Sequence, residues 1–243
     1  MGSVITWLGH STVLIESGGA RLLTDPLLRR RVAHLRRDNA VTVPGAAVDA
    51  VLLSHVHLDH FDQPSLRQVG KGTTVIVPRG SGRLVSRRGF TDVVELLPGD
   101  EHPVGDAVVR ATPAEHTAKR VPMTAIVPAI GYEVVGSDRV LFSGDTDRFG
   151  GMAELAGADA VLIPISGWGP KLPAGHLNPH SAAESLAVLR PRVAIPIHWG
   201  TYSPIHRRGA APVAPAAEFT AHAAECAPDV EVRVLAHGER TEL

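Results

Sequence analysis

Short apolar segments, many of them rich in β-branched residues, recur along the whole chain and are separated by glycine and proline. Segments of this length, bounded by turn-forming residues, are typical of β-strands. The pattern predicts strands over Val4–Trp7, Thr12–Glu16, Arg21–Thr24, Ala50–Leu53, Thr74–Val77, Asp92–Leu96, Ala107–Ala111, Ala125–Tyr132, Arg139–Phe142, Ala160–Ile165, Val193–Ile197 and Val230–Leu235. The chain is therefore expected to be built mainly from strands.

Helical patterns are fewer. Asn178 and Pro179 are the residue types preferred at an N-cap and at the first helical position, and apolar residues then recur on one helical face until Pro191. Further helices are expected over Gln63–Val69, Met152–Ala156 and Pro215–Cys226. Because strands dominate early and strands and helices alternate late, we expect two packed sheets flanked by helices.

Length and composition narrow the class of protein. A chain of 243 residues fits one large domain, and a formal net charge of −1 gives no long-range attraction to nucleic acid or to an anionic membrane. The single cysteine excludes an internal disulfide and is typical of a reducing compartment. With no secretory signal and no apolar run long enough to span a bilayer, we expect a cytoplasmic protein without a transmembrane segment.

Histidine is the unusual component, with thirteen residues against two tyrosines. Three of them lie with one aspartate in the segment from His55 to His60, which contains His57 and Asp59 and directly follows a predicted strand. A surface histidine cluster or an expression tag would be the ordinary explanation, but tags lie at the ends of a chain and lack an interleaved aspartate. Four ligand-type side chains in one turn favour a metal site.

Three more residues of ligand type occur near the ends of predicted strands. Asp145 follows Arg139–Phe142, His198 follows Val193–Ile197, and His116 lies in the predicted loop after Ala107–Ala111. Each residue alone would fit an ordinary loop position. Because open α/β sheets collect their ligands beyond the carboxyl ends of strands, the convergence of several such ends favours one shared site.

The order His-x-His-x-Asp-His, a lone His, Gly-Asp-Thr and a late His resembles the metallo-β-lactamase superfamily. The similarity covers about Ile5 to Leu235, and three shorter motifs, Trp7–Thr12, Thr24–Pro26 and His198–Thr201, resemble one branch of it. That branch contains N-acyl-phosphatidylethanolamine-hydrolysing phospholipase D and L-ascorbate-6-phosphate lactonase. The resemblance implies an α+β fold, a four-layer αββα sandwich, formed by a single domain over residues 1–243.

The resemblance also implies a ligand set for two divalent metal ions. One ion would be held by His55, His57 and His116, the other by Asp59, His60 and His198, with Asp145 bridging both. Nitrogen-rich coordination favours Zn²⁺, with Mn²⁺ or Fe as alternatives. The expected reaction is attack by metal-bound hydroxide on a phosphodiester, lactone or related ester bond of a small-molecule substrate. Asp59 is therefore counted among the catalytic residues.

Two other functions remain open. RNase Z-like nucleases share the His-x-His-x-Asp-His motif, although the neutral net charge and the lack of a recognisable RNA-binding arm argue against one here. A metal-loaded scaffold that binds a partner without catalysis would also fit the fold. All seven ligand positions are filled, which favours an enzyme, because degenerate members of such families lose ligands.

Residues around the ligands have candidate supporting roles. The resemblance brings the turn with His10 and the Asp25-Pro26 pair close to the metals, and Asp25 is expected to orient a ligand imidazole or else to be a plain turn residue. Trp168 would line a substrate pocket or cap the core. His176 is expected to face the substrate without binding metal and to donate a proton or hydrogen bond; packing of its loop is the alternative.

A basic cluster lies between two predicted strands. It consists of Arg29, Arg30, Arg31, Arg36 and Arg37. A solvated basic face is the usual interpretation of such a run. The functional alternative is a clamp for a phosphate or another anionic group, since guanidinium groups bind such anions with paired hydrogen bonds.

Overall fold

The computed structural model describes residues 2–40, 44, 47–118, 127–166, 172–206 and 212–243. Within these residues two large mixed sheets and one small sheet form. The first large sheet has the order β17 (Arg240–Glu242), β1 (Val4–Gly9), β2 (Thr12–Ser17), β3 (Ala20–Thr24), β6 (Ala50–Leu52), β7 (Thr74–Pro78) and β8 (Val93–Leu96). The second has the order β16 (Glu231–Val232), β14 (Val193–Ile197), β13 (Ala160–Pro164), β12 (Arg139–Phe142), β11 (Val127–Val135), β10 (Ala107–Ala118) and β9 (Glu101–Val104).

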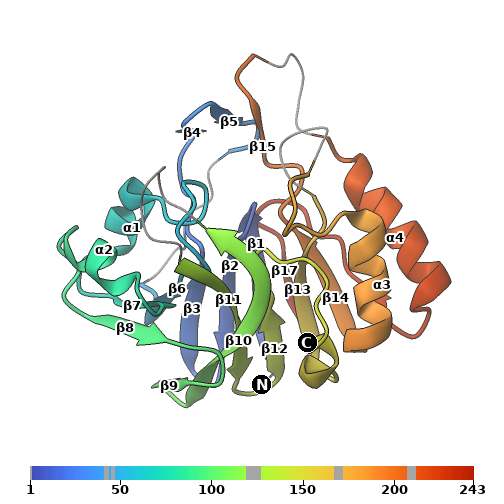
Figure 1. Cartoon of the computed structure of the whole chain (residues 1–243), viewed down its shortest axis with the longest axis horizontal. Helices are drawn as coiled ribbons and strands as arrows, with labels where there is room; N and C mark the ends of the chain where they lie inside the picture. Colours follow the sequence, from blue (N-terminus) through green and yellow to red (C-terminus); the bar gives the residue numbers. More distant parts are fainter. Residues whose placement is uncertain (1, 41–43, 45–46, 119–126, 167–171, 207–211) are drawn as a thin grey trace.

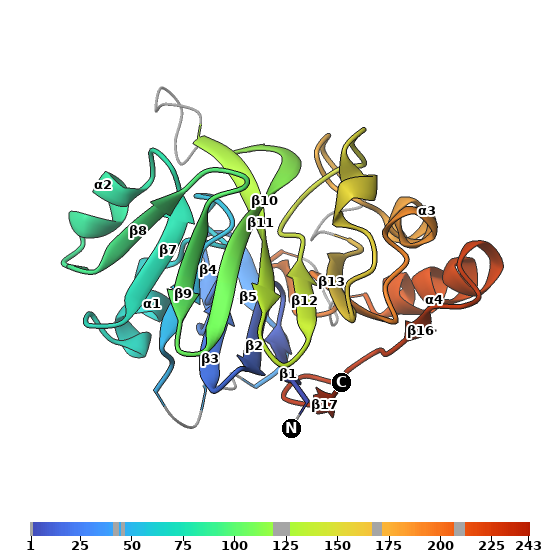
Figure 2. The same ribbon diagram turned by 90° about the horizontal axis from the view of Figure 1, so that it is seen from below.

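Helices cover the outer faces of both large sheets (Figures 1 and 2). They are α1 (Gln63–Val69) and α2 (Gly82–Ser86) on the first sheet and α3 (Pro179–Leu189) and α4 (Ala214–Cys226) on the second, with a 3₁₀ helix over Met152–Leu155. The predicted cap of α3 is confirmed, because the Asn178 side chain accepts hydrogen bonds from the backbone of His180 and Ser181. Among the described residues, no helix is both long and apolar enough to cross a bilayer.

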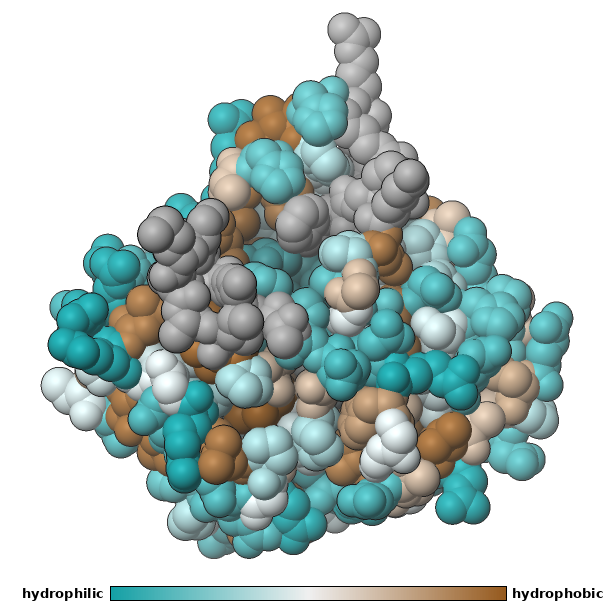
Figure 3. All heavy atoms as spheres, in the orientation of Figure 1, coloured by the Kyte–Doolittle hydropathy of each residue, from teal (hydrophilic) through white to brown (hydrophobic). Residues whose placement is uncertain are grey.

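The alternation of side chains along each strand builds the layers. On β13, Ala160 and Leu162 belong to the cluster between the two sheets, whereas Val161 and Ile163 pack toward the helices of the second sheet. On β6, Leu52 faces the same central cluster and Val51 packs on the opposite side. The expected four-layer αββα sandwich is thereby confirmed. Hydrophilic side chains cover most of the coloured part of the face shown in Figure 3.

The strand β10 corrects one expectation about the site. It continues to Ala118, so His116 lies within a strand and not in a loop after it. Pro113 lies at an irregularity where the pairing with β11 shifts, and the ladder resumes at Thr117. Proline is tolerated at such an irregularity because a ladder hydrogen bond is already missing there.

A small third sheet was not predicted from the sequence. It joins β4 (Arg31–Val32) and β5 (Leu35–Arg37) with β15 (Tyr202–Pro204), and it projects beyond the strands of the large sheets (Figure 1). Its strands have two or three residues each, too few for a recognisable alternation. The paired strands β5 and β15 are also more than 160 residues apart in the chain, so only the folded structure brings them together.

Candidate metal centre

The ligand-type residues converge where several strands end. His55 and His60 follow β6, Asp145 follows β12, and His198 follows β14. The loop after β6 closes tightly, because the carbonyl oxygen of His57 accepts hydrogen bonds from the backbone of both His60 and Phe61. This turn brings side chains that are close in sequence toward a common point.

The backbone is strained at three residues in and around this cluster. His10, Asp25 and His198 have positive φ angles of 54°, 31° and 64°, in the left-handed region that non-glycine residues rarely adopt. Such conformations cost about 1–3 kcal/mol each and persist where surrounding interactions enforce them. Their concentration around one point is an independent sign of a functional site.

We call His10, Asp59, His60 and His198 the inner group. One ligand atom from each lies within 4.8 Å of the others, and all four residues are buried. The Nδ1 atom of His60 donates to Asp25 over 2.7 Å, and Nδ1 of His198 donates to the carbonyl oxygen of Ser166 over the same distance. With Nδ1 engaged in this way, the Nε2 lone pair of both imidazoles is directed into the group.

We call His55, His57 and His116 the outer group, whose ligand atoms also lie within 4.8 Å of one another. His55 Nε2 and His116 Nε2 lie 3.0 and 3.3 Å from Nδ1 of His57. The Nδ1 atom of His116 donates to the carbonyl oxygen of Gly175, and that of His55 lies 2.9 Å from Ser54 Oγ. His57 is only partly buried, whereas His55 and His116 are buried, so this group borders the surface only at His57.

Asp145 lies between the two groups. Its Oδ2 is 3.1 Å from Nε2 of His60 and 3.9 Å from Nε2 of His55, while its Oδ1 is 3.4 Å from Nε2 of His198. Gly144 makes this position possible, because it has a φ of 61° and a Cβ atom there would lie 2.8 Å from the Cβ of Ser54. Only glycine meets both conditions without strain.

Burial and nearby charges shift the pKa values of the histidines in this cluster. Burial lowers the pKa of His55 well below its usual value and that of His116 to about 4, so both imidazoles are neutral near pH 7. Burial also lowers the pKa of His60, but the carboxylates of Asp145, Asp59 and Asp25 outweigh it and raise that pKa well above the usual value. The centre of the cluster therefore favours positive charge.

Unpaired polar atoms test whether metal ions fit. Nε2 of His60, Nε2 of His198 and Oδ1 of Asp145 are buried and have no hydrogen-bond partner among the described residues. Buried groups of this kind are normally satisfied, because leaving them unpaired costs about 1–3 kcal/mol each. All three belong to the expected ligand set. The donor set therefore fits divalent metal ions.

The structure also locates the residues expected around the ligands. Asp25 accepts hydrogen bonds from Ser54 as well as from His60, and His10 Nε2 lies 3.0 Å from Asp59 Oδ2. His176 is at the rim, with Nε2 3.5 Å from Oδ2 of Asp145. Trp168, expected near the substrate, lies outside the described residues.

Sequence reasoning missed two supporting hydroxyl groups. Ser54 Oγ donates to Asp25 over 2.5 Å and so connects Asp25 to His55. Thr201 Oγ1 accepts from the backbone of His10 over 2.7 Å. Both residues are adjacent to motifs that were identified, but serine and threonine are so common that their type alone gives no signal.

A comparison with known families agrees with the geometry. Residues 20–199 match the model of the beta-lactamase superfamily domain, which is more than half of the chain. The chain belongs to this family. A UPF0173 protein of Pyrococcus furiosus is 32% identical over 82% of this chain and 84% of its own length. A UPF0173 metal-dependent hydrolase of Methanopyrus kandleri is 30% identical over 98% of this chain and 99% of its own.

Solved structures of other proteins share the fold. Igni18, a metallo hydrolase from the archaeon Ignicoccus hospitalis, has a TM-score of 0.74 and 21% identity, and the match covers 100% of this chain and 99% of that one. An isothiocyanate hydrolase from Delia radicum gut bacteria has a TM-score of 0.75 and 19% identity, with 99% of each chain covered. At these identities the likeness concerns the fold alone.

Proposed function

We propose that this protein is a metal-dependent hydrolase that holds two divalent ions and cleaves a phosphodiester, lactone or related ester bond. The observation that carries the proposal is the arrangement of histidine nitrogens around Asp145. His55, His60 and His198 each have Nδ1 beside an oxygen atom and Nε2 within 3.9 Å of that carboxylate. Imidazoles oriented in this way present a lone pair to a cation.

The outer group would hold one ion and Asp59, His60 and His198 the other, with Asp145 shared between them. Imidazole and carboxylate ligands favour Zn²⁺, while Mn²⁺ and Fe accept the same donors. Bound in pairs, such ions lower the pKa of a coordinated water and stabilise negative charge on a substrate oxygen. His10 donates its Nε2 hydrogen to Asp59 in this scheme and so positions that carboxylate, which we regard as catalytic through its place beside the reacting groups.

His176 would donate a proton or hydrogen bond to the leaving group or to the developing oxyanion. Its Nδ1 lies 3.1 Å from the carbonyl oxygen of Pro173, which it reaches as a donor, and its Nε2 faces Asp145 at the edge of the cluster. Burial lowers the pKa of His176, but the hydrogen bond and the charge of Asp145 outweigh burial and raise it above the usual value. A protonated imidazole at the rim can donate to a leaving group or to a developing oxyanion.

Metal analysis coupled to a hydrolysis screen tests the proposal. Purified protein should contain about two transition-metal ions per chain, and chelation should abolish hydrolysis that Zn²⁺, Mn²⁺ or Fe²⁺ then restores. The screen compares a phosphodiester, a lactone, a thioester and an RNA oligomer. A protein that binds no metal, or that binds metal and cleaves none of these, would overturn the proposal in favour of a non-catalytic scaffold; cleavage of RNA alone would identify a nuclease.

A further inference from the structure

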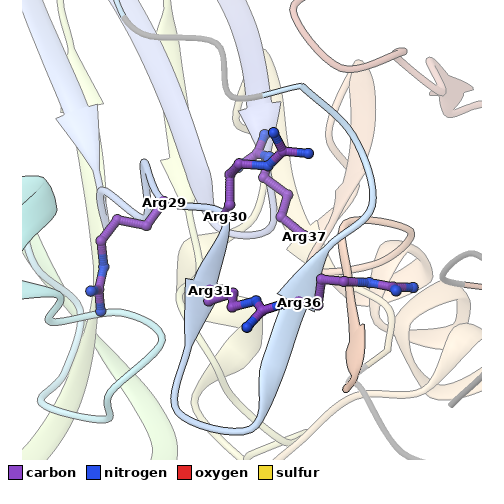
Figure 4. A pocket seen from close by; sticks show the side chains of 5 residues that line it. All are labelled: Arg29, Arg30, Arg31, Arg36 and Arg37. Atoms are coloured by element: carbon purple, nitrogen blue, oxygen red, sulfur yellow. The ribbon is translucent and has the colours of Figure 1, made fainter. Parts of the chain in front are cut away.

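Five arginines line a pocket of about 570 Å³ beside the small sheet. The residues are Arg29, Arg30, Arg31, Arg36 and Arg37, drawn in Figure 4, and we call their pocket the arginine pocket. It is distinct from the metal centre, because none of its lining residues belongs to the inner or outer group. Every described residue that lines the pocket carries a guanidinium group, and this concentration needs an explanation in terms of charge.

Only part of this charge is compensated within the described residues. Arg29 forms two hydrogen bonds with Asp62, at 2.9 and 2.7 Å, and points away from the other four toward that residue's loop (Figure 4). Arg36 pairs with Asp38 at 3.1 Å. Arg30 and Arg31 are exposed and form no ion pair with any described carboxylate. The open side of the pocket is therefore cationic.

Arg37 adds a buried charge. Arg37 is only 3% exposed, and none of the described carboxylates forms an ion pair with it. Its guanidinium group donates hydrogen bonds to the carbonyl oxygens of Leu8 and Leu27. Its Nε atom is buried and has no hydrogen-bond partner among the described residues. A buried cation with an unused donor is costly unless an anion compensates it.

The hairpin also holds like charges together. Arg31 on β4 is the direct cross-strand partner of Arg36 on β5, which places both side chains on the same face. The neighbouring pair, Val32 and Leu35, is buried on the other face in a small cluster with Tyr202. These apolar contacts fix the hairpin, so the two arginines cannot separate by moving the backbone. A bound anion would relieve this repulsion.

The pocket is close to the metal centre. The Arg37 guanidinium carbon lies 5.7 Å from the centre of the Tyr202 ring, and that ring lies 5.8 Å from the ring of His10 in the inner group. In addition, Arg29 forms a hydrogen bond with Asp62, which lies two residues after His60 in the chain. The pocket and the metal centre are therefore neighbours in the fold, separated by the Tyr202 ring.

We propose that the arginine pocket binds a phosphate group. Guanidinium groups match phosphate with paired, charge-assisted hydrogen bonds, and a phosphate near neutral pH carries enough charge to offset two neighbouring arginines. The group is either free phosphate or a phosphate carried by the substrate, remote from the bond that is cleaved. The second case rests on the proposed function.

Calorimetric titration with inorganic phosphate tests the pocket itself. Arg30→Gln/Arg31→Gln should lower the affinity at least about tenfold, because two charge-assisted contacts are removed, and raised salt should weaken binding to the unchanged protein. The matched control is Arg87→Gln/Arg88→Gln, an exposed adjacent pair outside the pocket that alters net charge equally. Phosphate also ligates metals, and both double variants keep the same metal centre, so their difference isolates the pocket. Equal affinities in the two double variants would overturn the proposal.

Hydrolysis of two matched carboxylic esters identifies the source of the phosphate. One ester ends in a phosphate and the other in a hydroxyl group, and the measured quantity is the ratio of their kcat/KM values. A ratio that falls about tenfold in Arg30→Gln/Arg31→Gln, and not in the control, assigns the pocket to the substrate. An unchanged ratio with phosphate binding still lost supports free phosphate as the ligand. If neither ester is cleaved, the proposed function fails on these substrates while the titration still decides the pocket.

Discussion

The inner and outer groups use the same kinds of ligand but differ in how they are held. Every member of the inner group is at most 6% exposed, and its imidazoles are anchored by Asp25 and by the backbone of Ser166. In the outer group His57 is partly exposed, and His116 is held by the carbonyl oxygen of Gly175. The inner group is thus fully enclosed, and the outer group is enclosed except at His57.

This difference separates two tasks that one centre must combine. Buried ligands fixed by further hydrogen bonds keep their geometry, because side-chain motion would break contacts that water cannot replace. A ligand that borders the surface, as His57 does, leaves room for a substrate, and the metal ion that it holds exchanges more easily. We therefore expect the inner ion to be retained longer and the outer ion to be nearer the substrate. The following changes test this contrast, in order of decreasing expected effect.

Replacement of the shared carboxylate should affect both halves. In Asp145→Ala the metal content should fall from about two ions per chain to well below one, with loss of hydrolysis, because a bridging ligand serves both sites. His57→Ala alters only the outer group and should retain about one ion. Metal analysis after gel filtration measures both. Full occupancy in Asp145→Ala would show that this residue does not bridge.

Removal of the rim histidine should leave both metals in place. His176→Ala is expected to lower kcat by about 10²–10³-fold, because a positioned proton donor is lost, while metal content and folding stay unchanged. His180→Ala provides the matched control, since this exposed histidine lies on α3 a few residues away. Loss of an ion in His176→Ala would make this residue a ligand, and normal turnover would remove it from the mechanism.

Weakening the support of one half should weaken that half most. Asp25→Asn keeps the shape of the side chain but removes the charge that His60 contacts directly, whereas Asp25 reaches His55 only through Ser54, so affinity for the ion at the inner group should fall about 10–100-fold and affinity for the other ion less. Competition with a chelator should then show one strongly weakened site and one closer to wild-type affinity. Equal weakening of both would contradict the division into an inner and an outer group, provided that circular dichroism shows an intact fold.

The support behind the inner group should make stability depend on pH. His237 Nε2 lies 2.9 Å from Oγ1 of Thr201, which holds His10, and His237 Nδ1 lies 2.7 Å from Nδ2 of Asn39. The neutral ring can donate from Nε2 and accept at Nδ1, so a second proton would face the amide hydrogens. Burial, followed by the charge of Arg37, lowers the pKa of His237 to about 4.

The direction in which stability changes with pH follows from the number of protons that the folded and unfolded states bind. Between pH 6.5 and about 4 the unfolded chain binds a proton at His237 that the folded chain does not, so stability falls as pH falls through this window. Because the ring is only partly buried, solvent screening keeps the contribution below about 3 kcal/mol. Urea unfolding at pH 7 and pH 4.5 should show a smaller loss for His237→Gln than for the unchanged protein. Equal losses would show that this histidine is not protonated differently in the two states.

Local patterns in the sequence were sufficient for most of the fold. The short apolar segments between glycine and proline and the Asn178-Pro179 cap depend on neighbouring residues only, and the structure has strands and helices at the predicted places. The His55–His60 motif likewise identified the loop of the site because its members are adjacent in the chain. His116 was placed correctly in the sequence but in the wrong element, since the irregularity at Pro113 depends on pairing with β11.

Only the tertiary structure decided the contacts between distant segments. The third sheet joins residues 31–37 to residues 202–204, and this pairing buries Arg37 within a cluster that appeared to be a solvated face. The same pairing places Tyr202 between Arg37 and His10. No window of sequence contains these contacts, because they depend on how the two large sheets bring their loops together at one edge. Sequence alone thus determined the elements and the chemistry of the ligands, whereas packing determined which half of the centre is enclosed and where the arginine pocket forms.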